Sequence, residues 1–229
     1  MKVAIMQPYL FPYIGYFQLI NIVEKFVLFD DVNYIKKGWI NRNNLMVNGK
    51  KMLFTISLVH ASQNKLINEI EIADKFEKFL KTIQINYSKA KYYKPTNELI
   101  NKIISYKQNN LADFIKNSLE KLTAYIGIEI EILVSSELNK NNSLKGQDKI
   151  LEICKLLKAS SYFNLPGGMS LYDKNKFIEE GIELYFIKTI NTPYKQFSKE
   201  FEPSLSIIDV LMHNSPERVK ELLNKYELI

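Results

Sequence analysis

The sequence of 229 residues contains one cysteine, one tryptophan and two histidines, and these scarcities exclude several kinds of chemistry. A single cysteine, Cys154, can form neither an intrachain disulfide nor a cysteine-based metal site, and its apolar position in a predicted helix favours a buried thiol. The two histidines, His60 and His213, lack the spacing of metal ligands, and we expect each in a loop or on the surface. No Walker loop, dinucleotide-binding glycine motif or Ser-His-Asp signature occurs. We therefore predict no protein-held metal site.

Long apolar runs are absent as well. No stretch reaches the roughly 18 consecutive apolar residues of a membrane span. The first residues lead directly into a predicted strand and lack the pattern of a signal peptide, so we expect a cytoplasmic protein. The net charge of +6 comes from lysines scattered among glutamates, and no nucleic-acid-binding motif occurs. This charge favours small anionic ligands over a specific nucleic acid.

Apolar residues make up 46% of the chain, and their periodicity predicts an α/β fold. Residues 3–6 are continuously apolar, as in a central strand that is buried on both faces of a parallel sheet. Gln7-Pro8 ends this strand, two prolines and three aromatic residues form a loop, and Gly15 opens a helix over 16–24. Residues 25–29 predict a second strand. Ligands of open parallel sheets bind at the carboxyl ends of such strands.

The remaining pattern alternates strands and helices. Asn48-Gly49 predicts a hairpin between 44–47 and 52–58, and 67–72 predicts a strand. Gly127 is expected to end the third of three helices that span 74–126. Further strands are expected at 129–134, 161–165 and 184–187, the last of the chain, and helices at 146–157, 171–180, 205–212 and 216–226. We predict one domain over 1–229, a mainly parallel Rossmann-like sheet flanked by helices, with 74–127 as a helical insertion.

Asp30 and Asp31 follow the second predicted strand and are the best acid/base candidates. A carboxylate at a strand end can take a proton from an amine or hold a sugar hydroxyl, and nearby cations would keep it ionised. The alternative is that the pair caps the following turn. If the first two strands are parallel neighbours, Gln7 reaches the same sheet edge. We expect Asp→Asn substitutions at these positions to disturb the fold little.

An aromatic and basic segment follows these carboxylates. Lys36, Lys37 and Arg42 could clamp a diphosphate, with Arg42 binding in bidentate fashion between Asn41 and Asn43, whereas a solvated loop is the alternative. Tyr34 and Trp39 could stack on a base or a sugar.

Two later segments also suggest ligand contacts or burial. Gly167-Gly168 allows close backbone approach to a ligand, although a plain tight turn would explain it equally well. Asp209 lies in an apolar run and needs a partner if it is buried, for which Arg42 is one candidate.

Three segments of the sequence resemble the WbqC-like family, bacterial proteins often encoded in O-antigen and other surface-polysaccharide loci. They are the opening block from Met6 to Phe17, the block Phe29-Asp30-Asp31-Val32-Asn33-Tyr34, and the block Lys37-Gly38-Trp39-Ile40-Asn41-Arg42-Asn43. The resemblance extends more thinly to Gly167-Gly168 and to 206–209. It implies a transferase that attaches an activated amino acid such as glycine to an amino sugar on a nucleotide carrier.

For this reaction we expect three catalytic residues, Asp30, Asp31 and Gln7, with an aspartate as the base and Gln7 orienting the acyl group. Arg42 and the N–H groups near Gly15 would hold phosphate, and any metal would be Mg²⁺ carried in with the phosphates. The expected substrate-binding residues are Tyr13, Gly15, Tyr16, Tyr34, Lys37, Trp39, Asn41, Arg42, Asn43, Gly167 and Gly168.

A looser similarity links Tyr13-Ile14-Gly15-Tyr16 with the His-Ile-Gly-His motif of nucleotidylyltransferases and class I aminoacyl-tRNA synthetases. Both histidines are tyrosines here, and tyrosine has no cationic form that could bind phosphate as histidine does. Two alternatives to acyl transfer therefore stay open. One is nucleotidylyl transfer, and the other is a non-catalytic protein that binds or scaffolds nucleotide sugars.

Overall fold

The computed structural model describes all residues from 1 to 229, and its centre is a sheet of six strands in the order β10-β9-β8-β1-β2-β7. Five of these strands are parallel, and β10 runs antiparallel to β9 along one edge. The sheet strands are β1 (Lys2–Met6), β2 (Lys25–Leu28), β7 (Glu131–Val134), β8 (Ser161–Asn164), β9 (Glu183–Thr189) and β10 (Tyr226–Leu228). The predicted α/β class with a mainly parallel sheet is confirmed.

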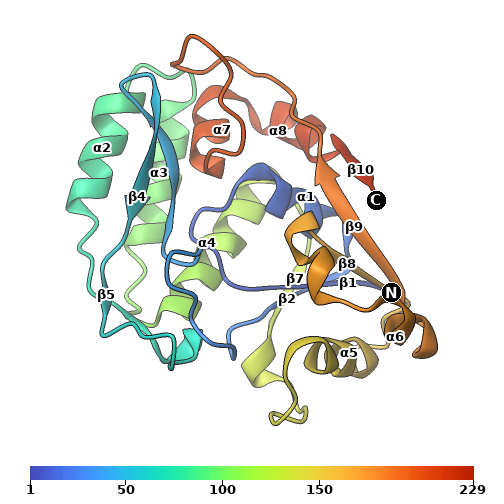
Figure 1. The fold of residues 1–229 in the computed structure, drawn as a ribbon. Coiled ribbons are helices and arrows are strands. Elements are labelled where there is room, and N and C mark those ends of the chain that lie inside the picture. Colours follow the sequence, from blue (N-terminus) through green and yellow to red (C-terminus); the bar gives the residue numbers. More distant parts are fainter.

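The central strand β1 shows how the sequence builds two cores. Successive side chains of a strand point to opposite faces of the sheet. Val3 and Ile5 accordingly pack with α5 (Gly146–Leu156) and α6 (Lys174–Glu179), whereas Ala4 and Met6 belong to the larger core on the opposite face. Figure 1 shows α5 and α6 below the sheet and α1 (Ile14–Ile22), α4 (Leu111–Ile126) and α8 (Pro216–Leu223) above it.

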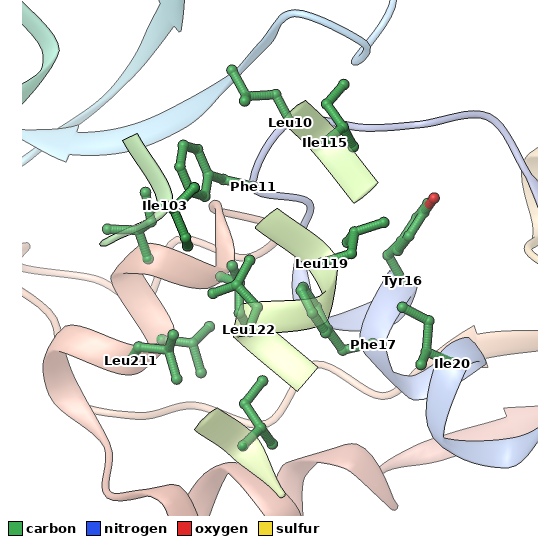
Figure 2. Packing of buried hydrophobic residues seen from close by; sticks show 14 of the residues in the cluster. Leu10, Phe11, Tyr16, Phe17, Ile20, Ile103, Ile115, Leu119, Leu122 and Leu211 are labelled. Carbon is green, nitrogen blue, oxygen red and sulfur yellow. The ribbon is translucent and has the colours of Figure 1, made fainter. Parts of the chain in front are cut away.

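The larger core continues beyond the sheet into an outer layer (Figure 1). Figure 2 shows α1 residues Phe17 and Ile20 facing Leu119 and Leu122 of α4, with Phe11 of the preceding loop close to Ile103. The outer layer contains α2 (Glu77–Tyr87), α3 (Tyr93–Ile104), α7 (Ile207–His213) and the hairpin of β3 (Arg42–Val47) and β4 (Lys50–Thr55). Helices of the 74–127 segment share this core with the sheet, and their interpretation as an insertion stays a prediction.

Three helix boundaries are explained by local chemistry. Asn110 accepts hydrogen bonds from the N–H groups of Ala112 and Asp113 at the start of α4, and Gly127 ends that helix with a φ of +80°. Ser215 accepts a hydrogen bond from Arg218 N–H at the start of α8. The other boundaries shift by a few residues, and α1 begins at Ile14 instead of at residue 16.

Some local predictions are wrong. The strand expected at 67–72 is a 3₁₀ turn (Ile67–Glu69) and a short strand β6 (Glu71–Ile72), which pairs with β5 (Leu58–Val59). Residues 166–171 form a 3₁₀ turn ahead of the short helix α6. The last strand is β10, because α8 ends at Leu223 and the chain then turns back along β9. No helix has both the length and the apolar character needed to cross a membrane.

The N-terminal and C-terminal segments are joined by buried hydrogen bonds. The side-chain amide of Gln18 in α1 donates to the carbonyl oxygens of Leu222 and Lys225, each over 2.9 Å. Ser206 Oγ donates to the Phe11 carbonyl over 2.8 Å, and Ile207 N–H donates to the Pro12 carbonyl. The opening loop and α1 are therefore fixed by the last part of the chain.

Candidate functional site

The carboxyl ends of β2 and β7 border a cavity of about 620 Å³, which we call the edge cavity. Its walls are mostly polar and come from the segment after β2, the 66–68 turn, the end of β7 and the start of α5. The lining residues are Asp31, Val32, Asn33, Leu66, Asn68, Ser136, Asn142, Leu144, Lys145, Gly146 and Lys149. A polar cavity at this edge of a parallel sheet is where ligands of α/β proteins bind.

Asp31 stands between two buried lysines at the wall of the edge cavity. Its carboxylate Oδ2 lies 2.8 Å from Lys140 Nζ and 2.7 Å from Lys149 Nζ, and Lys149 Nζ also donates to the Asp31 carbonyl over 2.9 Å. The side chains of Lys140 and Lys149 are 0% and 6% exposed. Burial alone would raise the pKa of Asp31, but the two ammonium groups hold it below its ordinary value. Asp31 is therefore an ionised anchor for two cations.

Asp30 has a different environment from its neighbour. It is 2% exposed, and its carboxylate accepts hydrogen bonds from Ser136 N–H at 2.9 Å, Ser136 Oγ at 2.6 Å and Asn68 Nδ2 at 3.1 Å. Asp30 thereby ties the end of β2 to the end of β7 and to the 66–68 turn. Its oxygens are occupied within the chain, which favours a structural role over proton transfer. These hydrogen bonds contradict the expectation that Asp30→Asn would disturb the fold little.

Helix α5 brings positive potential to the edge cavity. Its first residue, Gly146, and its flanking residue, Lys145, line the cavity, and no side chain caps this helix. The free N–H groups of a helix N-terminus favour anions. Lys145 is exposed and has no ion-pair partner. Lys145 and Lys149 line the cavity with one carboxylate, that of Asp31, so the charged lining residues have a net charge of +1 and suit an anionic group.

Gln7 was expected to orient the acyl group, and the N–H groups near Gly15 were expected to hold phosphate. β1 and β2 are parallel neighbours, so Gln7 does emerge at the same edge as Asp30. Gly15, however, is buried, and a Cβ at this position would collide with Thr189 Oγ1 and the Tyr13 ring. Thr189 and Tyr13 therefore cover the N-terminus of α1. The helix N-terminus that is open at this edge of the sheet belongs to α5.

The tyrosines of the opening block differ in exposure. Tyr16 is completely buried and donates to the Gln7 carbonyl over 2.8 Å, which fixes the end of β1. Tyr13 is half-buried, and its hydroxyl shares a hydrogen bond with Thr189. Burial raises the pKa of both phenols, so both are neutral at physiological pH. Only Tyr13 of this pair has surface available to a ligand.

The loop from Tyr34 to Asn43 is held by its own side chains. Tyr34 donates to Asn41 Oδ1 over 2.9 Å, and Asn41 Nδ2 donates to the Ile56 carbonyl over 2.9 Å. Asn43 Nδ2 donates to the carbonyls of Leu10 and Phe11 over 3.1 and 2.8 Å. The polar groups of these three predicted binding residues are therefore used in hydrogen bonds within the chain, and those of Asn43 join this loop to the opening loop.

Arg42 is also engaged with its own loop. Its guanidinium donates to the carbonyl oxygens of Gly38, at 2.8 Å, and Lys37, and lies 5.9 Å from the centre of the Trp39 ring. The Lys37 side chain is exposed and has no ion-pair partner. Neither cation lines the edge cavity, so the structure does not place the predicted diphosphate clamp beside Asp31.

A second, smaller cavity of about 230 Å³ lies between this loop and the opening block, and we call it the tryptophan pocket. Its lining residues are Tyr9, Pro12, Tyr13, Trp39, Asn43 and Ser204. This pocket thus brings together three of the predicted substrate-binding residues, Tyr13, Trp39 and Asn43. Of the predicted catalytic residues, Asp31 lines the edge cavity.

The two late glycines have different surroundings. Gly168 is buried, and a Cβ there would lie 3.2 Å from Asn164 Nδ2 and from the Tyr172 ring, so packing requires a small residue. Gly167 is exposed and follows β8, the neighbour of β1, and a Cβ added to it would meet nothing within 4 Å. Gly167 therefore lies open at the carboxyl edge of the sheet, where a ligand can approach it.

The suggested pair of Asp209 with Arg42 is wrong. Asp209 is 0% exposed, and its carboxylate accepts hydrogen bonds from Tyr87 and Tyr194, each over 2.8 Å, and from Gln196 Nε2 over 3.2 Å. The nearby His213 is half-buried at the end of α7, not in a loop or on the surface as expected. This cluster stabilises the outer layer and lines neither cavity.

Sequence reasoning missed Lys140 and Lys149. Lys149 lies one residue before Ile150, at the start of the apolar face of α5, where a lysine is typical of an ordinary surface position. One usable signal was present: a strand ending in Ser135-Ser136 next to a strand ending in Asp30-Asp31 makes those ends candidates for a shared site.

The chain belongs to the WbqC-like protein family, whose model matches residues 7–221. It is also similar to the uncharacterized protein Rv1507c of Mycobacterium tuberculosis, with 28% identity over 221 residues that cover 94% of this chain and 95% of that protein. No solved structure matches the chain. The comparisons thus support the family and leave the reaction to be argued from the site.

Proposed function

We propose that the edge cavity binds the diphosphate of a nucleotide-linked sugar, and that the chain is a cytoplasmic transferase of bacterial surface-polysaccharide precursor synthesis. The observation that carries this proposal is the pair of buried lysines anchored by Asp31 beside the uncapped start of α5. Buried ammonium groups keep their charge only when they are paired, and Asp31 supplies that pairing. Lys145 completes a wall with excess positive charge.

The group transferred would be an activated amino acid, glycine in the simplest case, and the acceptor would be the amine of the sugar. The amine nitrogen forms a bond to the acyl carbon, the bond from that carbon to its oxygen or sulfur leaving group breaks, and the amine loses a proton. Asp31 is the carboxylate nearest to the cavity that could receive this proton. Gln7, at the end of β1, and the open Gly167 would lie beside the sugar.

One observation favours a second candidate function. The lowered pKa of Asp31 makes it a weak base, and the oxygens of Asp30 are occupied. A protein that binds the nucleotide sugar without reacting would need the lysines and no base. Binding and turnover must therefore be measured separately.

The test of binding uses Lys145, which makes no contact that the fold needs. We expect Lys145→Glu to weaken binding of inorganic diphosphate and of the nucleoside diphosphates UDP, GDP and dTDP by about tenfold or more, as for a charge-assisted hydrogen bond of roughly 1.5–3 kcal/mol. Isothermal titration calorimetry measures this change. Lys89→Glu, between α2 and α3, makes the same charge change away from the cavity and should alter affinity by less than about twofold.

Equal affinities for wild type and Lys145→Glu would remove the edge cavity as the phosphate site. The test of turnover supplies a nucleotide-linked amino sugar together with a glycyl adenylate or a glycyl thioester, and mass spectrometry detects the glycylated sugar. Tight binding without any glycylated product would support the binding protein over the transferase.

A further inference from the structure

The tryptophan pocket lies outside the edge cavity, and its wall is unusual for this chain. Trp39 is the single tryptophan of the sequence, and it is 44% exposed. A single exposed apolar ring is ordinary on a protein surface, so only its surroundings can indicate whether it is prepared for a ligand.

One contact holds the indole ring and another holds the backbone that carries it. Arg42 lies over the ring at 5.9 Å and is itself fixed by the carbonyls of Gly38 and Lys37. The Trp39 carbonyl accepts a hydrogen bond from Leu10 N–H over 3.2 Å, which joins the loop to the opening block. An aromatic ring that is fixed before binding loses little conformational freedom when a ligand stacks on it.

The rest of the pocket offers flat surfaces and two free hydroxyls. Tyr9, Pro12 and Tyr13 line it opposite the loop, and the Tyr13 hydroxyl is hydrogen-bonded to Thr189. The Asn43 amide is fully used, because Nδ2 donates to two carbonyls and Oδ1 accepts from Asn44 N–H over 2.8 Å. The hydroxyls of Tyr9 and Ser204 make no hydrogen bond within the chain, but a sugar ring would bring more hydroxyls than these two can serve. A planar heteroaromatic ring would stack and keep its polar edge in solvent.

The volume limits the ligand further. At about 230 Å³ the tryptophan pocket is smaller than the roughly 300–1,000 Å³ of sites for whole drug-sized ligands. It therefore accommodates one ring system of a larger molecule. We propose that the tryptophan pocket binds the base of a nucleotide, stacked on Trp39.

This inference rests on the proposed function only in assigning the base to the nucleotide that carries the sugar. The tryptophan pocket follows the end of β1 and the edge cavity follows the ends of β2 and β7, and β1 and β2 are paired neighbours. Base and diphosphate would thus bind at the same edge of one sheet, on separate sets of residues.

The single tryptophan makes the test specific, because all indole fluorescence comes from this pocket. We expect uridine, guanosine or thymidine to change the Trp39 emission in a saturable way, and methyl glucoside and inorganic diphosphate to leave it unchanged. Saturable quenching by methyl glucoside with no response to any nucleoside would overturn the inference.

Calorimetry of variants supplies the second measurement. Trp39→Ala should weaken binding of the responding nucleoside diphosphate by roughly 5- to 100-fold, the range expected for loss of one stacked base, and Trp39→Phe should retain most of the affinity. Binding of inorganic diphosphate should stay within about twofold in both variants. Nucleoside diphosphate affinity that is unchanged in Trp39→Ala would also overturn the inference.

The two proposals fail in different ways. If Lys145→Glu weakens diphosphate binding and no nucleoside reaches Trp39, the phosphate site stands and the base pocket is wrong. If nucleosides quench Trp39 and Lys145→Glu changes nothing, the base pocket stands and the phosphate site is wrong.

Discussion

Two adjacent aspartates of this chain have opposite surroundings. Asp31 neutralises buried lysines at a cavity wall, and Asp30 accepts three hydrogen bonds that hold the ends of two strands together. Successive side chains of a strand point in different directions. Of these two neighbours, Asp31 therefore borders the edge cavity and Asp30 holds parts of the fold together. The catalytic hypothesis is therefore better placed on Asp31 than on the pair.

The structural role of Asp30 leads to a stability prediction. In Asp30→Asn one carboxylate oxygen becomes an NH₂ group that faces a hydrogen-bond donor of Ser136 or Asn68. We expect the free energy of unfolding to fall by about 1–3 kcal/mol, as for a buried polar group left without its partner. Urea unfolding followed by circular dichroism measures this loss. Glu129→Gln, which alters an exposed carboxylate without a hydrogen bond or ion pair, is the control and should change stability by less than roughly 0.5 kcal/mol.

A loss as small as that of the control would show that Asp30 is dispensable for the fold. Asp30 would then return to consideration as a catalytic group.

At the scale of elements, helix α1 depends on how closely it approaches β9. Gly15 occupies the first turn of α1, where a Cβ would collide with Thr189 of β9 and with the Tyr13 ring. The Tyr13 ring in turn lines the tryptophan pocket. The glycine of the opening block is therefore explained by packing, and phosphate contact is not needed to account for it.

We predict that Gly15→Ala lowers the free energy of unfolding by about 1–3 kcal/mol, the usual cost of overpacking a close contact. The displaced Tyr13 should also reduce the fluorescence response of Trp39 to nucleosides. Gly167→Ala is the control, because nothing lies within 4 Å of the added Cβ, and its stability should be nearly unchanged. Thermal unfolding of the two variants side by side measures the difference, and equal stabilities would contradict the packing explanation.

The elements that local sequence defines were predictable. β1 is a continuous apolar run, the β3–β4 hairpin turns at Asn48-Gly49, and α4 has both an Asn cap and a terminal glycine. β10 was missed because it has three residues and exists only through its pairing with β9. The two lysines of the edge cavity were missed because their burial depends on Asp31, which lies far earlier in the chain than either of them.

At the scale of the whole molecule, Asp209 connects three distant parts of the outer layer. Its partners are Tyr87 at the end of α2 and Tyr194 and Gln196 in the segment before α7, and His213 lies nearby. Burial raises the pKa of Asp209 above its ordinary 3.8, although the hydrogen bonds and His213 act in the opposite direction. Asp209 is therefore a completely buried titrating group within the outer layer.

The raised pKa fixes the sign of a pH effect. Between pH 3.8 and the raised pKa the folded chain binds more protons at Asp209 than the unfolded chain does, so this contribution to stability falls as the pH rises. Asp209→Asn lacks the titration. The free energy of unfolding of wild type minus that of Asp209→Asn should therefore decrease from about pH 4 up to the raised pKa, by at most about 1.4 kcal/mol per pH unit.

Urea unfolding across this pH range measures the difference, with Glu129→Gln, at an exposed carboxylate without an ion pair, as the control. A difference that increases with pH would show that the three hydrogen bonds outweigh burial and lower the pKa of Asp209.

The order of folding depends on three long-range hydrogen bonds, from Gln18 to Leu222 and Lys225 and from Ser206 to Phe11. A chain that grows from its N-terminus exposes its opening block first, yet the groups that fix this block are synthesised last. While it is still attached to the ribosome, the nascent chain therefore carries an unpaired, apolar α1, and contacts over some 200 residues close only after release. Residues 7–17, at the start of the segment that matches the family, reach their native form at the end of folding.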